Sequence, residues 1–394
     1  MQKQLVRRML DIAKDGALAV TYWDGSTECF GQGEPTCKII LNKEPDAKML
    51  LSDPILTLGE AYMDGGIDLE GSIGDLLRYA YINQNSFLQN NPRIKEMLRQ
   101  LRHATSLVKQ KKDIQHHYDL GNDFFSLWLD ETLSYSCAYF QTEEDSLGQA
   151  QQQKNNYILK KLQLKPGETL LDIGSGWGQL IIQAAQKYGV KSLGITLSEE
   201  QYRETKKRIA GLHLQDQVEV EMADYREVAQ KDRLFNKIVS VGMLEHVGKA
   251  NLPKYFEAVN KLLKPQGLSL LHTITHIKEG AVNSWIEKYI FPGGYIPTLR
   301  ELIGLMPDYS FHLLDAESLR MHYALTLDHW VRNFEKHAET VRAKMGESFV
   351  RMWRLYLQAC AASFRYSGLD LHQLLFSKGL NNALPLTRQH LYTN

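Results

Sequence analysis

Short apolar runs alternate with amphipathic stretches between residues 169 and 273. Runs rich in aliphatic and β-branched residues predict strands, and apolar positions three or four residues apart predict helices. The predicted strands are Thr169–Ile173, Lys191–Thr196, Val218–Met222, Lys237–Val241 and Leu268–Thr273. Strands that alternate with helices in this way indicate an α/β fold, in which ligands bind beyond the carboxyl ends of the strands.

The regions on either side carry other patterns. Residues 1–90 predict a small α/β domain for packing or docking, with a strand at Ala17–Trp23 and a hairpin turn at Asp24-Gly25. Residues 276–310 have weak periodicity and many aromatic residues, which favours a lid or substrate loop over a satellite hydrophobic cluster. Toward the end of the chain we expect helices at Ala316–Arg342 and Glu347–Tyr366 and a strand at Asp370–Phe376.

Composition narrows the functional classes. The 394 residues include 46 basic and 46 acidic side chains, so zero net charge argues against binding nucleic acid. The four cysteines are too few and too scattered for a disulfide framework or a metal cluster, so we expect no metal site and a reducing, cytoplasmic compartment. Because no apolar run approaches the ~18 residues of a membrane span, any association with a membrane is expected to be peripheral.

Residues 91–112 stand out by their charge. This segment holds seven Lys or Arg residues and one Glu, a net charge of 7 − 1 = +6, interleaved with apolar residues. One interpretation is a solvated basic linker. The other is attraction to an anionic membrane surface, worth about 1 kcal/mol for each basic residue near the surface.

A glycine-rich turn follows the first strand of the α/β region. The sequence from Asp172 to Gly178 reads Asp-Ile-Gly-Ser-Gly-Trp-Gly, and a helical pattern follows from Gln179. Glycines permit the φ values of the turn and a close approach of a ligand to the backbone, while the next helix directs free N–H groups toward that ligand. The spacing differs from the Gly-x-Gly-x-x-Gly of dinucleotide-binding folds and resembles the first motif of class I methyltransferases. A tight turn without a ligand is the alternative.

Further motifs, in order along the chain, resemble those of the cyclopropane-fatty-acyl-phospholipid synthases and the related mycolic acid cyclopropane synthases. The similarity covers residues 113–394, and residues 1–90 resemble the extra domain of the phospholipid-acting branch. Ser175 stands where the family often has Cys. The matching segments are Gln115–Asp119 with Asn122–Phe125, Tyr135–Phe140, Leu171–Gly178, Thr196–Gln201, Glu245–Gly248, Leu271–Ile274 and Tyr323–Leu327.

This resemblance implies a fold, an activity and partners. The fold would be a Rossmann-like class I methyltransferase with a mainly parallel seven-stranded sheet in residues 113–394, joined through the 91–112 linker to a lipid-docking or packing domain. The enzyme would transfer the methyl group of S-adenosylmethionine to a cis double bond of a phospholipid acyl chain and close a cyclopropane ring. The partners would be unsaturated membrane phospholipids, with a homodimer bound peripherally to the cytoplasmic face of the membrane.

The resemblance also assigns candidate site residues. In the family the base that removes the final proton is thought to be a bound bicarbonate ion. The residues that match its cradle, and so count as catalytic, are Cys137, Glu245, His272, Ile274 (through its backbone) and Tyr323. The residues expected to bind S-adenosylmethionine are Tyr118, Tyr135, Ser136, Asp172, Gly174, Gly176, Gly178, Thr196, Leu197, Gln201 and Asp224.

Several of these residues have other interpretations. His272 lies in an apolar run, where a core histidine is common, and Glu245 with His246 could be a surface pair. Cys137 could be a nucleophile, but methyl transfer to an alkene requires none, and Cys360 is expected to pack in a helix. Gln201, three residues after Ser198, could complete a capping box, bind the ribose, or do both.

Two other functions remain open at this point. One is a related lipid methyltransferase that leaves a methyl or methylene branch, or one that acts on a small molecule. The other is a lipid-binding protein without activity.

Overall fold

The computed structural model describes residues 2–11, 15–83, 120–280 and 282–392. Their contacts divide into two compact units. The first comprises the N-terminal residues together with Gly280–Pro292 and Leu327–Gly368, and the second comprises the rest. Segments of the predicted lid and of the C-terminal helices therefore pack with the N-terminal region, whereas the sequence placed them with residues 113–394.

The first unit contains a four-stranded sheet in the order β2-β1-β3-β4. Strand β1 is antiparallel to β2 and parallel to β3, and its apolar residues Leu18 and Val20 are fully buried. The elements are α1 (Gln2–Leu10), β1 (Ala17–Thr21), β2 (Thr27–Gly31), β3 (Lys38–Leu41), α2 (Ala47–Ser52), α3 (Pro54–Met63), β4 (Ile67–Glu70), α4 (Ile73–Ile82), α14 (Ser284–Tyr289), α17 (Ala338–Met345), α18 (Glu347–Tyr366) and most of α16 (Arg320–Lys336).

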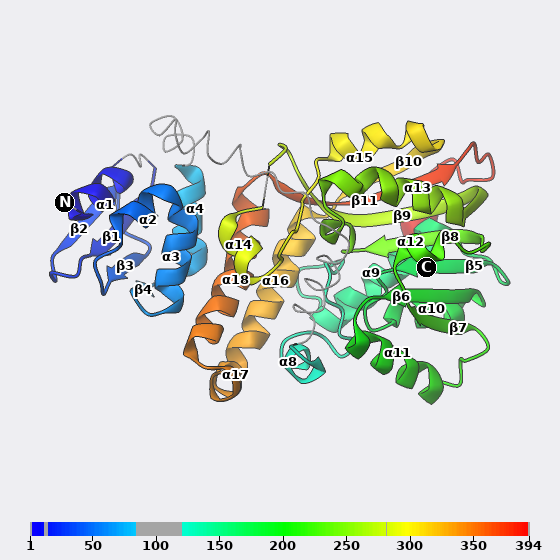
Figure 1. The fold of residues 1–394 in the computed structure, drawn as a ribbon, viewed down its shortest axis with the longest axis horizontal. Helices are drawn as coiled ribbons and strands as arrows, with labels where there is room; N and C mark the ends of the chain where they lie inside the picture. Colours follow the sequence, from blue (N-terminus) through cyan, green and yellow to red (C-terminus); the bar gives the residue numbers. More distant parts are fainter. Residues whose placement is uncertain (1, 12–14, 84–119, 281, 393–394) are drawn as a thin grey trace. The chain divides into compact units, whose positions relative to one another are not determined.

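The second unit is built on a seven-stranded sheet in the order β10-β11-β9-β8-β5-β6-β7, with β7 and β10 at its edges (Figure 1). The pairs from β9 to β7 are parallel, and β11 is antiparallel to both β9 and β10. The strands are β5 (Thr169–Ile173), β6 (Lys191–Thr196), β7 (Val218–Met222), β8 (Phe235–Val241), β9 (Leu263–His276), β10 (Phe311–Ser318) and β11 (Leu369–Lys378). This sheet confirms the predicted class I methyltransferase fold.

Helices precede, connect and follow the strands of this unit. They are α8 (Asn122–Ser126), α9 (Leu147–Leu162), α10 (Gln179–Tyr188), α11 (Glu199–Gly211), α12 (Tyr225–Val228), α13 (Leu252–Leu262), α15 (Leu299–Leu305), α19 (Gln389–Tyr392) and the short 3₁₀ helices η1 (Leu244–His246), η2 (Lys249–Asn251) and η3 (Pro307–Tyr309). The prediction that a helix starts at Ala316 is wrong, because residues 316–318 pair with β11 as the end of β10.

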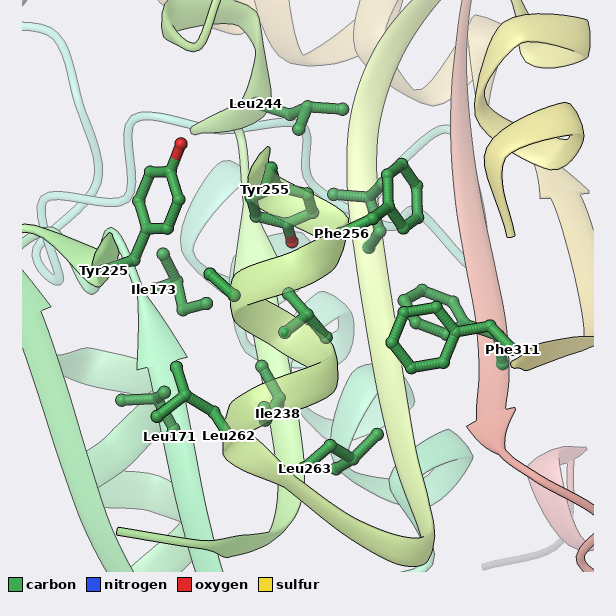
Figure 2. Packing of buried hydrophobic residues seen from close by; sticks show 14 of the residues in the cluster. Leu171, Ile173, Tyr225, Ile238, Leu244, Tyr255, Phe256, Leu262, Leu263 and Phe311 are labelled. Atoms are coloured by element: carbon green, nitrogen blue, oxygen red, sulfur yellow. The ribbon is translucent and has the colours of Figure 1, made fainter. Parts of the chain in front are cut away.

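Both faces of the central strands are buried, which explains their nearly continuous apolar sequences. Successive residues of β5 belong to different hydrophobic clusters: Leu171 and Ile173 to one, Leu170 to the other. Figure 2 shows Leu171, Ile173 and Ile238 gathered with Tyr255 and Leu262 of α13. This packing fixes β5, whose carboxyl end carries the glycine-rich turn.

Candidate functional site

The glycine-rich turn adopts the backbone that its sequence predicts. Gly174, Gly176 and Gly178 have φ values of +86°, +54° and +81°, a region that L-residues with a side chain rarely occupy. A Cβ at Gly174 would lie 2.9 Å from Met243, and one at Gly178 would collide with Thr205, whereas one at Gly176 would meet nothing within 4 Å. Close packing therefore explains the first and third glycines, and the second leaves open space beside the turn.

That space belongs to a cavity of about 150 Å³ at the carboxyl ends of β5, β6 and β8. Most residues expected to bind S-adenosylmethionine line it. They are Tyr135, Ser136, Asp172, Gly174, Gly176, Thr196, Leu197, Gln201 and Asp224. Gly178 supports the turn behind the cavity, and Tyr118 lies outside the described residues.

Hydrogen bonds order the polar wall at the end of β6. The Thr196 hydroxyl donates to Gln201 Oε1 at 2.7 Å and accepts from the N–H of Ser198 at 3.1 Å. Ser198 caps α11 by accepting from the N–H of Gln201 at 3.4 Å. The Gln201 side chain is thus directed to Thr196 at the cavity, so of the interpretations considered for Gln201, its backbone serves the cap and its side chain faces the proposed cofactor site.

Asp224 is paired within the protein. Its carboxylate accepts from the N–H of Arg226 at 2.8 Å, and the Arg226 guanidinium contacts both of its oxygens at 2.6 and 2.5 Å. Arg226 also lines the cavity, and the sequence did not single it out. The Asp224–Arg226 pair therefore forms a fixed polar rim after β7.

Glu245 is held at the end of β8 by a neighbouring strand. Its Oε1 accepts from the N–H of Ile274 at 2.7 Å, and its Oε2 is buried without a hydrogen-bond partner. Burial raises the pKa of Glu245, although the bond from Ile274 acts in the opposite direction. Burial also lowers the pKa of the neighbouring His246 to about 4, so the two residues do not form a solvated surface pair.

His272 lies on β9 and is fully buried. Its Nδ1 is 3.2 Å from Nε2 of Gln373 on β11, and its Nε2 has no hydrogen-bond partner. Burial is the main cause that holds its pKa well below the ordinary value, with help from the positive charge of Lys154. With the Gln373 amide donating to Nδ1, the neutral ring carries its proton on Nε2.

A series of contacts links Cys137 and Tyr323 to strands β11 and β9. The Cys137 thiol, fully buried with a raised pKa caused by burial, lies 3.2 Å from the carbonyl oxygen of Ala138 and 4.0 Å from that of Leu319. The N–H of Tyr323 donates to Leu319, and the N–H of Leu319 donates to Leu371, which pairs with Ile274. A thiol that stays protonated is not an activated nucleophile, which favours the interpretation that Cys137 lines a site.

The structure thus brings together two groups of predicted residues. The cofactor candidates line the cavity, and the catalytic candidates cluster around the carboxyl end of β9 without lining that cavity. Sequence reasoning missed Lys154, which lines the cavity from α9 and is 4% exposed. The available signal was its position in the apolar stripe of that helix, between Ala150 and Ile158.

Comparison with known proteins identifies the family of the chain. The family model for mycolic acid cyclopropane synthetase matches residues 105–374, and a model described as a domain of unknown function matches residues 5–92. A probable fatty acid methyltransferase of Pseudomonas putida is 37% identical and covers 95% of this chain and 96% of its own length. The cyclopropane-fatty-acyl-phospholipid synthase of Escherichia coli K12 is 39% identical, with coverages of 88% and 89%.

Solved structures agree. The cyclopropane synthase MmaA2 from Mycobacterium tuberculosis has a TM-score of 0.65 and 35% identity, and it covers 68% of this chain and 98% of its own. The mycolic acid cyclopropane synthase CmaA1, complexed with SAH and CTAB, has a TM-score of 0.64, 34% identity and the same coverages. The family model and these relatives together place the chain in the mycolic acid cyclopropane synthetase family, among the cyclopropane-fatty-acyl-phospholipid synthase-like, S-adenosylmethionine-dependent methyltransferases.

Proposed function

We propose that this protein converts a cis double bond in a phospholipid acyl chain into a cyclopropane ring. The single observation that carries the proposal is the buried pair of polar atoms, Glu245 Oε2 and His272 Nε2, which have no protein partner. Such atoms are costly unless a ligand completes their hydrogen bonds. A methyltransferase acting on oxygen or nitrogen nucleophiles has less need for a separate buried base site.

The residues of the cavity fit S-adenosylmethionine. When bound, it supplies an electrophilic methyl group on a sulfonium. Gly176 leaves room for a ligand beside the backbone, Thr196 and Gln201 offer polar groups, and Asp172 is a buried carboxylate whose Oδ1 has no partner. Tyr135 offers an aromatic face, which favours a cation.

The chemistry of the alkene sets the demands on the second group of residues. An isolated double bond is a weak nucleophile, so the two reactants must be held close and in line. The substrate then carries a positive charge, which water would capture unless the site excludes it. A general base must finally remove one proton from the added methyl group, and the electrons of that C–H bond close the ring.

The environment of Glu245 and His272 fits a bicarbonate ion in the role of that base. Such an anion needs donors, and the Nε2–H of a neutral His272 can supply one. Burial raises the pKa of Glu245, which lowers the cost of bringing an anion beside its carboxyl group. Tyr323 and the buried Cys137 thiol would complete the polar lining, and the Ile274 N–H, which holds Glu245, would fix the position of that carboxyl group.

A lipid methyltransferase that leaves a branch is the second candidate. The observation in its favour is that the relative covering 95% of this chain is named as a probable fatty acid methyltransferase. The two reactions share the methyl transfer and differ in the last step, because ring closure removes a proton without leaving a double bond.

The deciding experiment uses purified protein, vesicles of monounsaturated phosphatidylethanolamine, and S-adenosylmethionine labelled with a trideuteromethyl group. A cyclopropane product would retain two deuterium atoms, lose its alkene protons and show upfield ring protons by NMR. Loss of a proton from a neighbouring chain carbon would give a methyl-branched alkene that retains three deuterium atoms. A methylene branch would retain two deuterium atoms, like the ring, but would show alkene signals. Either branched product would refute ring closure.

We also infer that the protein acts at the membrane surface as a homodimer. The support is the sequence of residues 91–112, which lie outside the described part of the chain, and the resemblance to the phospholipid-acting branch. Light scattering of the full chain measures the oligomeric state, and a monomer would refute the dimer.

A further inference from the structure

Lys154 is a buried cation on the wall of the cavity. It lies on α9 and is 4% exposed, and its Nζ donates to the Ser136 hydroxyl at 3.0 Å. Ser136 is itself fixed, because the side-chain amide of Gln151 donates to its carbonyl oxygen at 2.8 Å. The ammonium group therefore has a defined position beside the cavity.

No carboxylate in the described part of the chain lies within 4.0 Å of this ammonium. The groups whose charges favour its charged form are Asp130, Cys137 and Asp172, of which Asp130 and Asp172 are carboxylates. Asp130 is engaged elsewhere, since its oxygens accept from the N–H groups of Thr132 and Ser134 at 3.0 and 2.9 Å. A buried charge that is held by one hydroxyl group is costly unless an anion approaches it.

Lys161, on the same helix, is a buried lysine with a structural role and serves as a comparison. It follows Lys154 by seven residues, or about two turns, and is 1% exposed. Its Nζ contacts Glu317 at 2.5 Å and Asp315 at 3.3 Å, so two carboxylates neutralise it. Lys154 lacks such a pair and faces a cavity instead.

Asp172 supplies the opposite charge on the same cavity. It lies on β5, is 3% exposed, and its Oδ1 has no hydrogen-bond partner. One wall thus presents an ammonium from α9 and another presents a carboxylate from β5, and neither group is in contact with the other. A zwitterion with an α-carboxylate and an α-ammonium matches this arrangement of charges.

We propose that Lys154 binds the α-carboxylate of the amino-acid moiety of S-adenosylmethionine, while Asp172 receives the α-ammonium. This inference rests on the proposed function, because it assigns a role within the same cofactor site. Lys154 is then a specificity-determining residue: it selects the complete amino-acid moiety over nucleosides that lack the carboxylate.

The first test compares two ligands on the unmodified full-length protein. S-adenosylmethionine and decarboxylated S-adenosylmethionine differ only in the carboxylate, and both carry the sulfonium. Calorimetric titration without lipid avoids turnover. We expect the intact cofactor to bind roughly tenfold to a hundredfold more tightly, the range for a charge-assisted hydrogen bond. Equal affinities would overturn the inference, whether or not any variant folds.

The second test uses Lys154→Met, which keeps an apolar stem of similar length. In this variant we expect the affinity for S-adenosylmethionine to fall to that for the decarboxylated form, whose binding changes little. Lys154→Arg should restore part of the preference. Lys161→Met is the matched control, since it removes a buried lysine of the same helix away from the cavity, and the folded fraction of each variant is checked by circular dichroism.

The outcomes separate this inference from the proposed function. If the unmodified protein binds S-adenosylmethionine but Lys154→Met keeps the preference for the carboxylate, the role of Lys154 is refuted and the proposed function stands. An equal loss of affinity for both ligands in folded Lys154→Met would also refute the role of Lys154 in binding the carboxylate, because its role would then be structural. If the unmodified protein binds neither ligand, the proposed function fails as well.

Discussion

Glu245 is the residue for which chemistry and geometry make the sharpest prediction. In the unmodified protein, Glu245 Oε1 accepts from the Ile274 N–H at 2.7 Å. Glu245→Gln keeps an oxygen that can accept this bond but removes the ionisable group. We expect cofactor binding to persist and turnover to fall by roughly 10²–10⁴-fold, the range for loss of a general base, because the amide would hold the proposed bicarbonate base less well. Calorimetry with S-adenosylmethionine and an assay of ring formation measure the two effects separately.

The control for this substitution is Glu257→Gln. Glu257 is a half-exposed carboxylate that pairs with Lys261 one turn away on α13. Its loss should change neither binding nor turnover, because exposed pairs contribute little. Near-normal turnover in Glu245→Gln would remove Glu245 from the catalytic group.

Asp172 gives a prediction about protons. Burial raises its pKa to about 7, so in the free protein it is mostly protonated at pH 6. An ammonium group placed beside it favours the charged form and lowers this pKa. Binding of S-adenosylmethionine at pH 6 should therefore release most of one proton, and affinity should rise as the pH increases from about 5 to 7.

Calorimetry at pH 6 in two buffers with different ionisation enthalpies measures this release. In Asp172→Asn, which cannot ionise, the released proton should disappear together with the pH dependence in this range. Release of the same size in the variant would assign the proton to another group and would contradict the role of Asp172.

Single residues of the site were predictable only where a motif carried them. Asp172 and Gln201 follow from motifs next to strand ends, and the structure places both at the cavity. Lys154 belongs to no such motif, and in a helix rich in Gln and Lys its charge indicates a solvated face. Its burial arises from the packing of α9, which contacts β9, and that packing is a long-range property.

Among the elements, the turn between β5 and α10 separates stability from binding. In Gly178→Ala, the alanine must adopt a left-handed backbone conformation, which costs about 1–2 kcal/mol, and its Cβ also collides with Thr205. In Gly176→Ala, the alanine has the same backbone cost without a collision, but its methyl group is added beside the cavity. We expect Gly178→Ala to lower the free energy of unfolding more, and Gly176→Ala to weaken cofactor binding more.

Urea denaturation and calorimetry measure these two effects. Adding Thr205→Ser to Gly178→Ala removes the colliding methyl group and should recover part of the lost stability. If the two alanine variants show the same ratio of lost stability to lost affinity, Gly178 and Gly176 do not have separate roles in stability and in cofactor binding.

Local pattern predicted the parallel strands better than the edge of the sheet. The boundaries of β5, β6 and β7 agree with the prediction, because short apolar runs end there in turns. Strand β10 was missed: residues 311–318 do not alternate, and five of its eight residues are exposed. Its strand conformation depends on hydrogen bonding with β11, about 60 residues later in the chain, which local periodicity does not reveal.

At the scale of the whole molecule, charge is balanced overall but uneven along the chain. The net charge is zero, yet residues 91–112 carry +6. None of the helices in the described part of the chain has the length and apolarity needed to cross a bilayer. The proposed action on a membrane phospholipid requires contact with the bilayer, and the concentrated basic segment, which lies outside the described residues, is the candidate for that contact.

Replacing Arg99, Arg102, Lys109, Lys111 and Lys112 with Gln tests this idea. Attraction to anionic lipid is screened by salt, with a Debye length of about 10 Å at 0.1 M, so binding to vesicles containing phosphatidylglycerol should weaken mainly at low ionic strength. Sedimentation with vesicles at several salt concentrations measures this binding. The matched control removes the same five charges from exposed positions elsewhere, Lys191, Arg203, Lys206, Lys207 and Lys261. Equal effects of both sets would indicate a response to net charge alone, and no effect of the first set would reduce the segment to a linker.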